Sequence, residues 1–99
     1  MYARMTVAQV QPEHFDAALA AVPEAFLPAA HAQPGYRGFL LLSDRATPQR
    51  VGISLWETEA DLQTSGGVSG DYQQQMEDFR GLLVSPPTTT TYDVAVHEP

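Results

Sequence analysis

The alternation of apolar and polar residues divides this chain into strand-like and helix-like segments. Residues 2–11, 36–43, 50–56 and 88–97 are rich in β-branched, aromatic and aliphatic side chains, which is typical of β-strands. Apolar residues at helical spacing follow the first of these strands and also the third. The pattern therefore predicts the element order β-α-β-β-α-β.

The first predicted helix begins at Pro12, where the missing N–H of proline leaves no hydrogen bond unmade. Two further prolines, Pro23 and Pro28, cannot donate to the preceding turn, so we expect this helix to be kinked or divided into segments. The sequence Pro34-Gly35 predicts its end. Its apolar stripe consists of Phe15, Ala18, Leu19, Val22 and Phe26.

A β-hairpin is predicted in the middle of the chain. Strands 36–43 and 50–56 flank a polar connector, residues 44–49, that contains a proline. The sequence Thr58-Glu59-Ala60-Asp61 has the form of a capping box, which predicts a short helix over residues 58–65.

Glycines in residues 66–70 predict a break after this short helix, either a flexible lid or a simple interruption. The helix can begin again at Ser69 or Asp71 and end at Ser85-Pro86-Pro87. Its inward face would carry Tyr72, Met76, Phe79 and Leu83.

Right-handed connections place strands in this order in one antiparallel sheet. The predicted class is α+β: a ferredoxin-like βαββαβ plait, with a four-stranded antiparallel sheet and the helices on one face. A chain of 99 residues suits a single domain, which we expect to span residues 1–99.

Both faces of the predicted hairpin are unusually apolar. In Phe39-Leu40-Leu41-Leu42 both alternating sets of side chains are apolar, and residues 51–56 carry no charge on either set. A sheet with helices on one face should instead present polar residues on the other. We therefore expect a homodimer in which two sheets face each other, because burying each aliphatic side chain contributes about 1.5–3 kcal/mol.

Composition excludes several classes of partner. The net charge is −7 and all five basic residues are arginine, without a basic cluster, so we expect no nucleic-acid and no membrane-surface binding. The chain contains no cysteine, which excludes disulfides and a cysteine nucleophile. The first residues lack the apolar core of a signal peptide, and no apolar run is long enough to span a bilayer. We expect a soluble, cytoplasmic protein.

The hairpin and the residues after it resemble the antibiotic biosynthesis monooxygenase (ABM) family, in the dimeric α+β-barrel superfamily. Two motifs are responsible: Pro34-Gly35-Tyr36-Arg37-Gly38-Phe39, which opens the second strand, and Ile53-Ser54-Leu55-Trp56-Glu57-Thr58-Glu59-Ala60, which closes the third. The element order extends the resemblance over the whole chain. The resemblance implies a fold shared with cofactor-free oxygenases of polyketide aromatics, haem-degrading enzymes and small-metabolite enzymes, and it places Trp56 at the tryptophan that lines the oxygenase pocket.

Two departures from the family pattern bear on function. The haem-degrading branch requires an asparagine on the first strand, together with a tryptophan and a histidine on the second helix. This chain contains no asparagine and has no histidine between His31 and His97, so haem degradation is not expected. The asparagine of the oxygenase branch is missing as well.

The predicted register determines which residues could form a ligand site. If Leu40 pairs with Ile53, then residues 52, 54 and 56 share a face with residues 37, 39 and 41. Glycine and serine beside the indole of Trp56 would leave room for a planar ligand between the sheet and the helices. The residues expected to bind this ligand are Trp56, Phe39, Tyr72 and Phe26. The alternative is that these side chains only pack in the core.

Arg37 and His31 are the candidates for chemistry. An arginine could stabilise a developing negative charge on the ligand, and a histidine at the pocket rim could act as a general base. The alternative is the more common role of such residues: a solvated or ion-paired arginine at the start of a strand, and a lone exposed histidine. The three histidines lack metal-ligand spacing, so no metal site is expected.

These observations support two functions. The first is a cofactor-independent oxygenase of a small electron-rich aromatic, such as a phenol or an anthrone-like compound. The second is a non-catalytic homodimer that binds a small molecule or has a structural role. An isomerase or another small-metabolite enzyme on the same fold is a third possibility.

Overall fold

The computed structural model describes residues 1–43, 46–65 and 80–98. The strands are β1 (Tyr2–Gln9), β2 (Tyr36–Ser43), β3 (Gln49–Trp56) and β4 (Thr88–Asp93). The α-helices are α1 (Phe15–Ala21), α2 (Leu27–His31) and α3 (Glu59–Ser65). Each strand falls within one residue of its predicted start.

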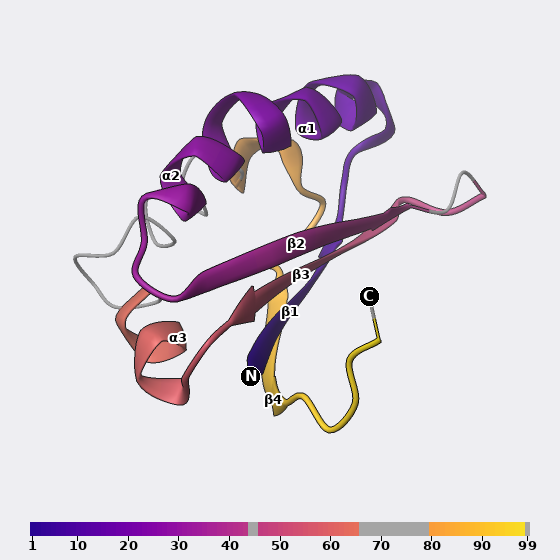
Figure 1. Ribbon diagram of the computed structural model, residues 1–99. Coiled ribbons are helices and arrows are strands. Elements are labelled where there is room, and N and C mark those ends of the chain that lie inside the picture. Colours follow the sequence, from indigo (N-terminus) through magenta and orange to yellow (C-terminus); the bar gives the residue numbers. More distant parts are fainter. Residues whose placement is uncertain (44–45, 66–79, 99) are drawn as a thin grey trace.

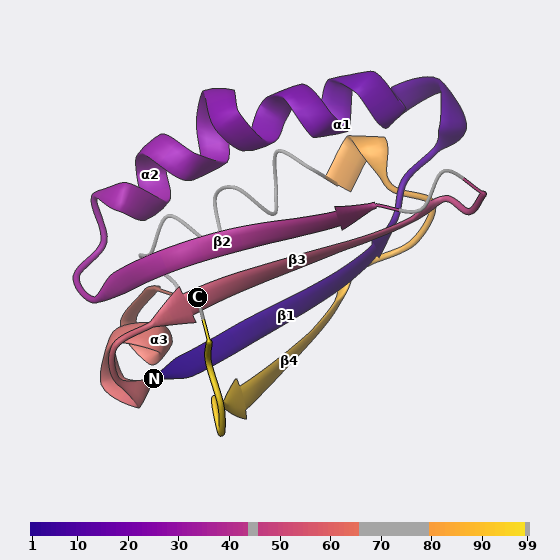
Figure 2. The ribbon, with the colours of Figure 1, turned by 45° about the vertical axis from the view of Figure 1, so that its right-hand side comes forward.

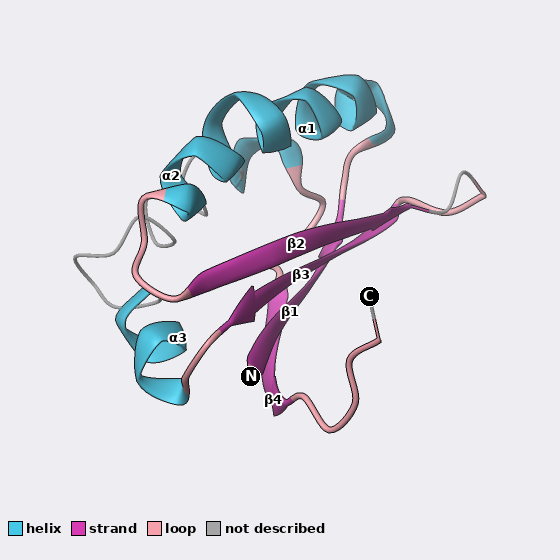
Figure 3. Ribbon diagram, viewed as in Figure 1, coloured by secondary structure: helices cyan, strands magenta, loops and turns pink. Residues whose placement is uncertain are grey.

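The four strands form one antiparallel sheet in the order β2-β3-β1-β4. Figure 1 and Figure 2 show α1 and α2 crossing over one face of this sheet, with α3 at the end where β1 begins and β3 ends. The helices and strands are distinguished by colour in Figure 3. This arrangement confirms the predicted ferredoxin-like α+β fold. No helix within the described residues is long and apolar enough to cross a membrane.

The segmented first helix is confirmed. A 3₁₀ turn, η1 (Pro12–His14), leads into α1, and a π-helical turn, η2 (Val22–Phe26), separates α1 from α2. In η2 the N–H of Leu27 bonds to the carbonyl of Val22, five residues back. Pro23 has no N–H to give to the α-helical ladder, and a wider turn accommodates that loss.

The predicted hairpin register is also confirmed, except at one residue. Leu40 pairs with Ile53, and the neighbouring pairs continue on both sides. Between Tyr36 and Gly38 the register shifts, because Arg37 is an extra residue that forms a β-bulge. Gly38 adopts φ +152°, a conformation open to glycine. The prediction that Arg37 shares the face of Trp56 was therefore wrong.

Local signals at α3 behave as predicted, whereas two strand ends do not. The backbone N–H of Asp61 donates to Thr58 Oγ1 at 3.1 Å, the expected cap. The last strand was predicted to reach residue 97 but ends at Asp93, which pairs with Tyr2 at the start of β1; beyond this pair the N–H of Val94 donates to the carbonyl of Met1 at 2.9 Å. The first strand was predicted to end at residue 11; beyond Gln9 only an isolated bridge continues, from Val10 to Leu83.

The predicted second part of this helix lies mostly outside the described residues. Within the part that is described, the 3₁₀ turn η3 (Arg80–Leu82) precedes Leu83. Leu83 is buried with Val10 and Ala18 in a small core beneath α1. The proposed role of residues 66–70 as a lid or break cannot be compared with the structure, because they lie outside the described ranges.

The two faces of the sheet differ in exposure. On the face beneath the helices, Val10 and Ser54 are buried. On the opposite face, Leu40 and Leu42 are 54% and 49% exposed in the single chain. They lie beside Val51, Ile53 and Leu55, which are half-buried. We call this second surface the open face; it is the uncovered apolar surface that the sequence pattern predicted.

Candidate ligand-binding site

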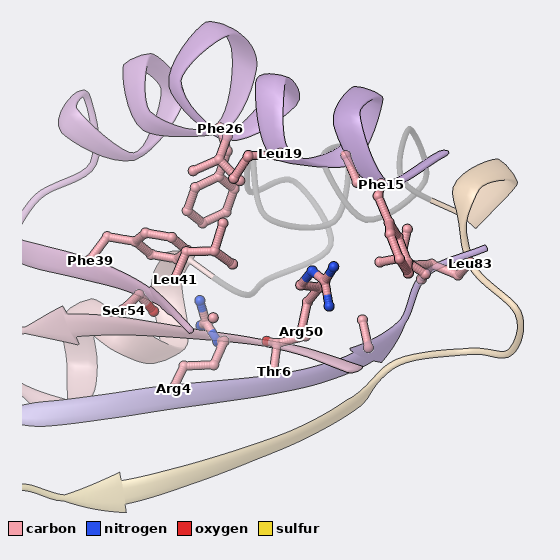
Figure 4. Close-up of a pocket in the computed structure, with 15 residues that line it drawn as sticks. Arg4, Thr6, Phe15, Leu19, Phe26, Phe39, Leu41, Arg50, Ser54 and Leu83 are labelled. Carbon is pink, nitrogen blue, oxygen red and sulfur yellow. The ribbon is translucent and has the colours of Figure 1, made fainter. Parts of the chain in front are cut away.

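A cavity of about 100 Å³ lies between the sheet and the first helical region (Figure 4). Its floor comes from the helix-covered face of β1, β2 and β3, and its roof from α1 and η2. The described lining residues are Arg4, Thr6, Ala8, Val10, Phe15, Ala18, Leu19, Val22, Phe26, Phe39, Leu41, Arg50, Gly52, Ser54 and Leu83. Most of these side chains are apolar, as is usual for a small-molecule site.

The floor is formed by three cross-strand pairs of β1 and β3. These pairs are Arg4 with Ser54, Thr6 with Gly52, and Ala8 with Arg50. The middle of the floor is low because Gly52 has no side chain. A Cβ there would lie 3.1 Å from Phe39 Cζ, so the ring of Phe39 occupies the space that glycine leaves.

Two phenylalanines close one end of the cavity. The rings of Phe26, from η2, and Phe39, from β2, have centroids 4.9 Å apart and are tilted by 50°. This geometry is typical of a favourable aromatic pair. Figure 4 shows the Phe26 ring pointing from the helical region toward Phe39 and Leu41, which lie side by side on β2, with Leu19 beside Phe26. A flat aromatic ligand could pack against these two rings.

Arg4 is the most buried charged residue that lines the cavity, at 5% exposure. Its Nη2 donates to the carbonyl of Leu62 at 2.6 Å and to Ser65 Oγ at 2.9 Å. Ser65 Oγ in turn donates to the Leu62 carbonyl at 2.7 Å. The end of α3 therefore holds one edge of the guanidinium in place.

Arg50 lies at the other end of the floor and is half-buried. Its guanidinium carbon is 4.3 Å from the centre of the Phe15 ring, within cation–π range. Its Nη1 donates to the carbonyls of Thr47 and Gln49 at 3.0 and 2.8 Å.

Trp56 does not belong to the cavity lining. It is 2% exposed, and its Nε1 donates to Ser54 Oγ at 2.9 Å. Its ring lies edge-on to Tyr36, with centroids 5.7 Å apart, and 5.8 Å from the guanidinium carbon of Arg4. The indole thus contacts Ser54 and Arg4 without lining the cavity itself. A direct contact between Trp56 and a ligand stays a prediction.

The other residues singled out in the sequence lie in different places. Phe26 and Phe39 are brought together in the cavity. Arg37 is exposed and forms an ion pair with Glu57. His31, the last residue of α2, is exposed, with its ring 5.1 Å from that of Tyr36. Neither Arg37 nor His31 lines the cavity, and Tyr72 lies outside the described residues.

The titration behaviour of Tyr36 reflects its surroundings. Burial raises the pKa of the Tyr36 phenol above its ordinary value, because the phenolate would be poorly solvated there. Within the described ranges, no three His, Asp or Glu side chains come close enough together to hold a metal ion.

Sequence reasoning overlooked Arg4 and Thr6. Both belong to the set Arg4, Thr6, Ala8 and Val10, which alternates along β1. Because Val10 and Ala8 are apolar, period-two alternation could have placed Arg4 on the covered face as well. In the sequence analysis this arginine entered only through the net charge.

The fold and the cavity define a ferredoxin-like α+β protein with an aromatic-lined site beneath its first helical region. Residues 1–67 match the model of the antibiotic biosynthesis monooxygenase family, and this chain belongs to that family. It is 35% identical over 65 residues to an uncharacterized protein of Mycobacterium tuberculosis, Rv2557. That alignment covers 66% of this chain and 29% of the relative, so the chain spans less than a third of the length of this curated relative.

Solved structures of similar fold include two oxygenases. A monooxygenase from the gene ActVA-Orf6 of Streptomyces coelicolor, in complex with nanaomycin D, superimposes with a TM-score of 0.81 at 15% identity, covering 99% of this chain and 91% of that one. A mutant of SnoaB, a cofactor-independent oxygenase from Streptomyces nogalater, gives 0.74 at 16% identity, covering 99% and 96%. At these identities the likeness shows the fold alone.

Proposed function

We propose that this protein binds a small electron-rich aromatic compound in the cavity and oxygenates it with O₂, without a cofactor. The observation that carries the proposal is the cavity itself: an apolar space closed by the Phe26–Phe39 pair and floored by Gly52, Thr6 and Arg4, on a chain of the ABM family. Relatives of the same fold include a cofactor-independent oxygenase.

The size of the cavity favours a ligand with one ring. Its volume is about 100 Å³. For comparison, an engineered apolar cavity of about 150 Å³ binds benzene. A single-ring phenol whose outer edge extends to the mouth is therefore a better candidate than an anthrone-like compound.

The proposed oxygenation requires little from the protein beyond a cavity that binds and orients the phenol. An electron-rich phenol supplies the electrons to O₂. One atom of O₂ forms a carbonyl at the carbon para to the hydroxyl, and the phenol oxygen becomes the second carbonyl. The other atom of O₂ leaves as water, with the hydrogens lost from that carbon and from the hydroxyl. The apolar walls orient the ring and exclude water, and the exclusion of water strengthens the electrostatic interactions inside the cavity. The product is a quinone.

A second function, binding without catalysis, is favoured by one specific observation. Among the described residues that line the cavity there is no Asp, Glu or His. A general base would thus have to come from elsewhere, or the phenol would have to enter as its anion.

We also propose that the open face is covered by a second copy of this chain. Leu40 and Leu42 are about half exposed, and burying each fully is worth up to about 1.5–3 kcal/mol. The open face is aliphatic across β2 and β3, which suits a self-complementary interface between two sheets.

Oxygen uptake with 2-methoxyphenol tests the oxygenase. Wild type should consume one O₂ for each quinone formed. Thr6→Phe, which fills the cavity from the floor with a residue suited to a strand, should lower the rate at least about tenfold, the equivalent of 1.4 kcal/mol. Thr64→Phe makes the same replacement on the exposed side of α3, away from the cavity lining, and should leave the rate unchanged.

The outcomes separate the two functions. Uptake that is insensitive to Thr6→Phe would contradict the assignment of the cavity. Binding of 2-methoxyphenol that Thr6→Phe abolishes, without any uptake by wild type, would support the non-catalytic binder and reject the oxygenase.

A further inference from the structure

The ring of Phe39 extends beyond its own partner in the sheet. Phe39 pairs with Ser54 across β2 and β3, and Leu41 pairs with Gly52. The outer edge of the Phe39 ring nevertheless lies against Gly52, because side chains in a strand lean along the strand direction. The ring therefore reaches from its position opposite Ser54 to the next position of the cavity floor.

Gly52 makes this placement possible. A Cβ atom at this position would lie 3.1 Å from Phe39 Cζ, which is closer than two carbon atoms normally approach. Among the described glycines, those with a positive φ are Gly35 and Gly38, so the backbone at Gly52 has a conformation that other residues also adopt. Glycine weakens the interior of a strand and commonly marks a place where another group approaches closely. Here that group is the ring of Phe39.

Phe26 contacts the same ring from the side of the helices. The two ring centroids are 4.9 Å apart, and Figure 4 shows Phe26 pointing from the helical region toward Phe39. Phe26 belongs to the π-helical turn η2, which is closed by the hydrogen bond from the N–H of Leu27 to the carbonyl of Val22. The Phe39 ring is thus held between the floor at Gly52 and the roof at Phe26.

We propose that Phe39 is the residue that limits the ligand of this cavity to a single ring, and that Gly52 is its positioning residue. This inference rests on the proposed function because it uses the same cavity, but it names the residue that selects the ligand. The cavity has a volume of about 100 Å³ with the Phe39 ring in place. Since a side chain sets the limit, one substitution can remove it.

Neighbouring wall residues are less suited to set this limit. Leu19 is 58% exposed, so it borders solvent as well as the cavity. Leu41 lies beside Phe39 and is the residue that pairs with Gly52, but the side-chain atoms closest to a Cβ at Gly52 belong to Phe39. The Phe39 ring, and not Leu41, therefore occupies the space above Gly52.

Removal of this ring would leave a space that a second ring can fill. Phe39→Ala deletes a phenyl group, so the vacated space has the shape of one benzene ring and lies between Gly52 and Phe26. An apolar cavity left by removal of a core side chain stays dry and can bind benzene. A phenol with a fused second ring could place that ring there and regain an aromatic contact with Phe26.

The test compares 2-methoxyphenol with its benzo-fused analogue, 2-methoxy-1-naphthol. The two compounds differ only by the second ring, and calorimetric titration under nitrogen measures their binding without oxygenation. Wild type should bind the one-ring compound at least about tenfold more tightly, and Phe39→Ala should reverse this preference by at least about tenfold. Phe39→Leu keeps part of the bulk and should give an intermediate ratio.

Two controls isolate the effect of the second ring. 4-Nitrophenol, a one-ring phenol too electron-poor to be oxygenated readily, should follow 2-methoxyphenol in every variant. If it followed the naphthol instead, the number of rings would not be what Phe39 selects. Val84→Ala truncates an exposed apolar residue outside the cavity lining and should leave all three affinities unchanged.

Gly52→Ala tests the positioning role. The added methyl group would displace the Phe39 ring and should weaken the binding of 2-methoxyphenol about tenfold. In a Phe39→Ala background the methyl group meets no ring, so the same substitution should change the affinity by less than about twofold. Equal effects in the two backgrounds would show that Gly52 does not act through Phe39.

Wild type alone can overturn the inference, so the outcome does not depend on whether the variants fold. If wild type binds 2-methoxy-1-naphthol as tightly as 2-methoxyphenol, Phe39 does not limit the ligand to one ring, although the cavity stands as a binding site. If Phe39→Ala weakens the binding of both compounds equally, the ring is only part of the wall. If wild type binds neither compound, the proposed function is wrong and this inference with it.

Discussion

The two faces of this sheet are built from alternate residues of the same strands, and both carry apolar side chains, but they differ in what covers them. The covered face combines the apolar residues Phe39 and Leu41 with the small or polar residues Arg4, Thr6, Gly52 and Ser54. The open face carries aliphatic residues such as Ile53 and is left uncovered in the single chain. Polar groups lie where a ligand would need them, and apolar groups lie where a partner would cover them.

This comparison shows how period-two alternation gives a small domain two separate surfaces. A substitution at one residue of a strand changes the cavity, whereas a substitution at the next residue changes the open face. The two surfaces can therefore be tested by separate substitutions.

Trp56 should be the most costly residue to truncate. Trp56→Ala removes a side chain that is 2% exposed and leaves Ser54 and Arg4 without their support. We expect the free energy of unfolding to fall by about 3–5 kcal/mol. Urea denaturation at fixed protein concentration measures the loss. A loss below about 1 kcal/mol, no larger than that of Tyr92→Ala on the exposed β4, would mean that Trp56 is not a structural support of the covered face.

Ile53 is the matching residue on the open face. Ile53→Asp places a charge at the centre of the proposed interface, once in each copy, and should weaken the dimer at least about 100-fold, or roughly 3 kcal/mol. Sedimentation velocity over a range of concentrations measures the change. Gln63→Asp adds the same charge on the exposed side of α3 and should leave the mass unaltered. An undisturbed dimer in Ile53→Asp would place the interface elsewhere.

Tyr36 should have the smallest effect, visible only at high pH. Its folded-state pKa is raised, so above the ordinary value of about 10 the unfolded chain loses this proton first. Stability is therefore retained below pH 10 and declines as the pH rises from there through the folded-state pKa. Tyr36→Phe should make this decline shallower in unfolding measurements between pH 9 and 11. An unchanged slope would show that the phenol is well solvated.

Much of the fold could be predicted because local signals determine it. Prolines set the segments of the first helix, Thr58 caps α3, and the Leu40–Ile53 register follows from the apolar pattern. The strand ends were less predictable: the end of β4 depends on its pairing with β1, which is a property of the neighbouring strand.

The site was predictable only in part. Alternation placed Phe39 on the covered face, but the bulge at Arg37 changed the alignment by one residue and left that arginine in solvent. The cavity also depends on how η2 carries Phe26 over the sheet, a tertiary feature without a short sequence signature. As a result, Arg37 and Trp56 were predicted at the site, whereas the described arginines that line the cavity are Arg4 and Arg50.

A native mass spectrum of wild type with saturating 4-nitrophenol tests the division of roles between the two faces most directly. We predict a mass of two chains carrying two molecules of the probe, one in each cavity, with the dimer intact whether or not the probe is present. A single chain at micromolar concentration would contradict the role of the open face. A dimer that holds one probe molecule between its two chains would contradict the placement of the site beneath the helices.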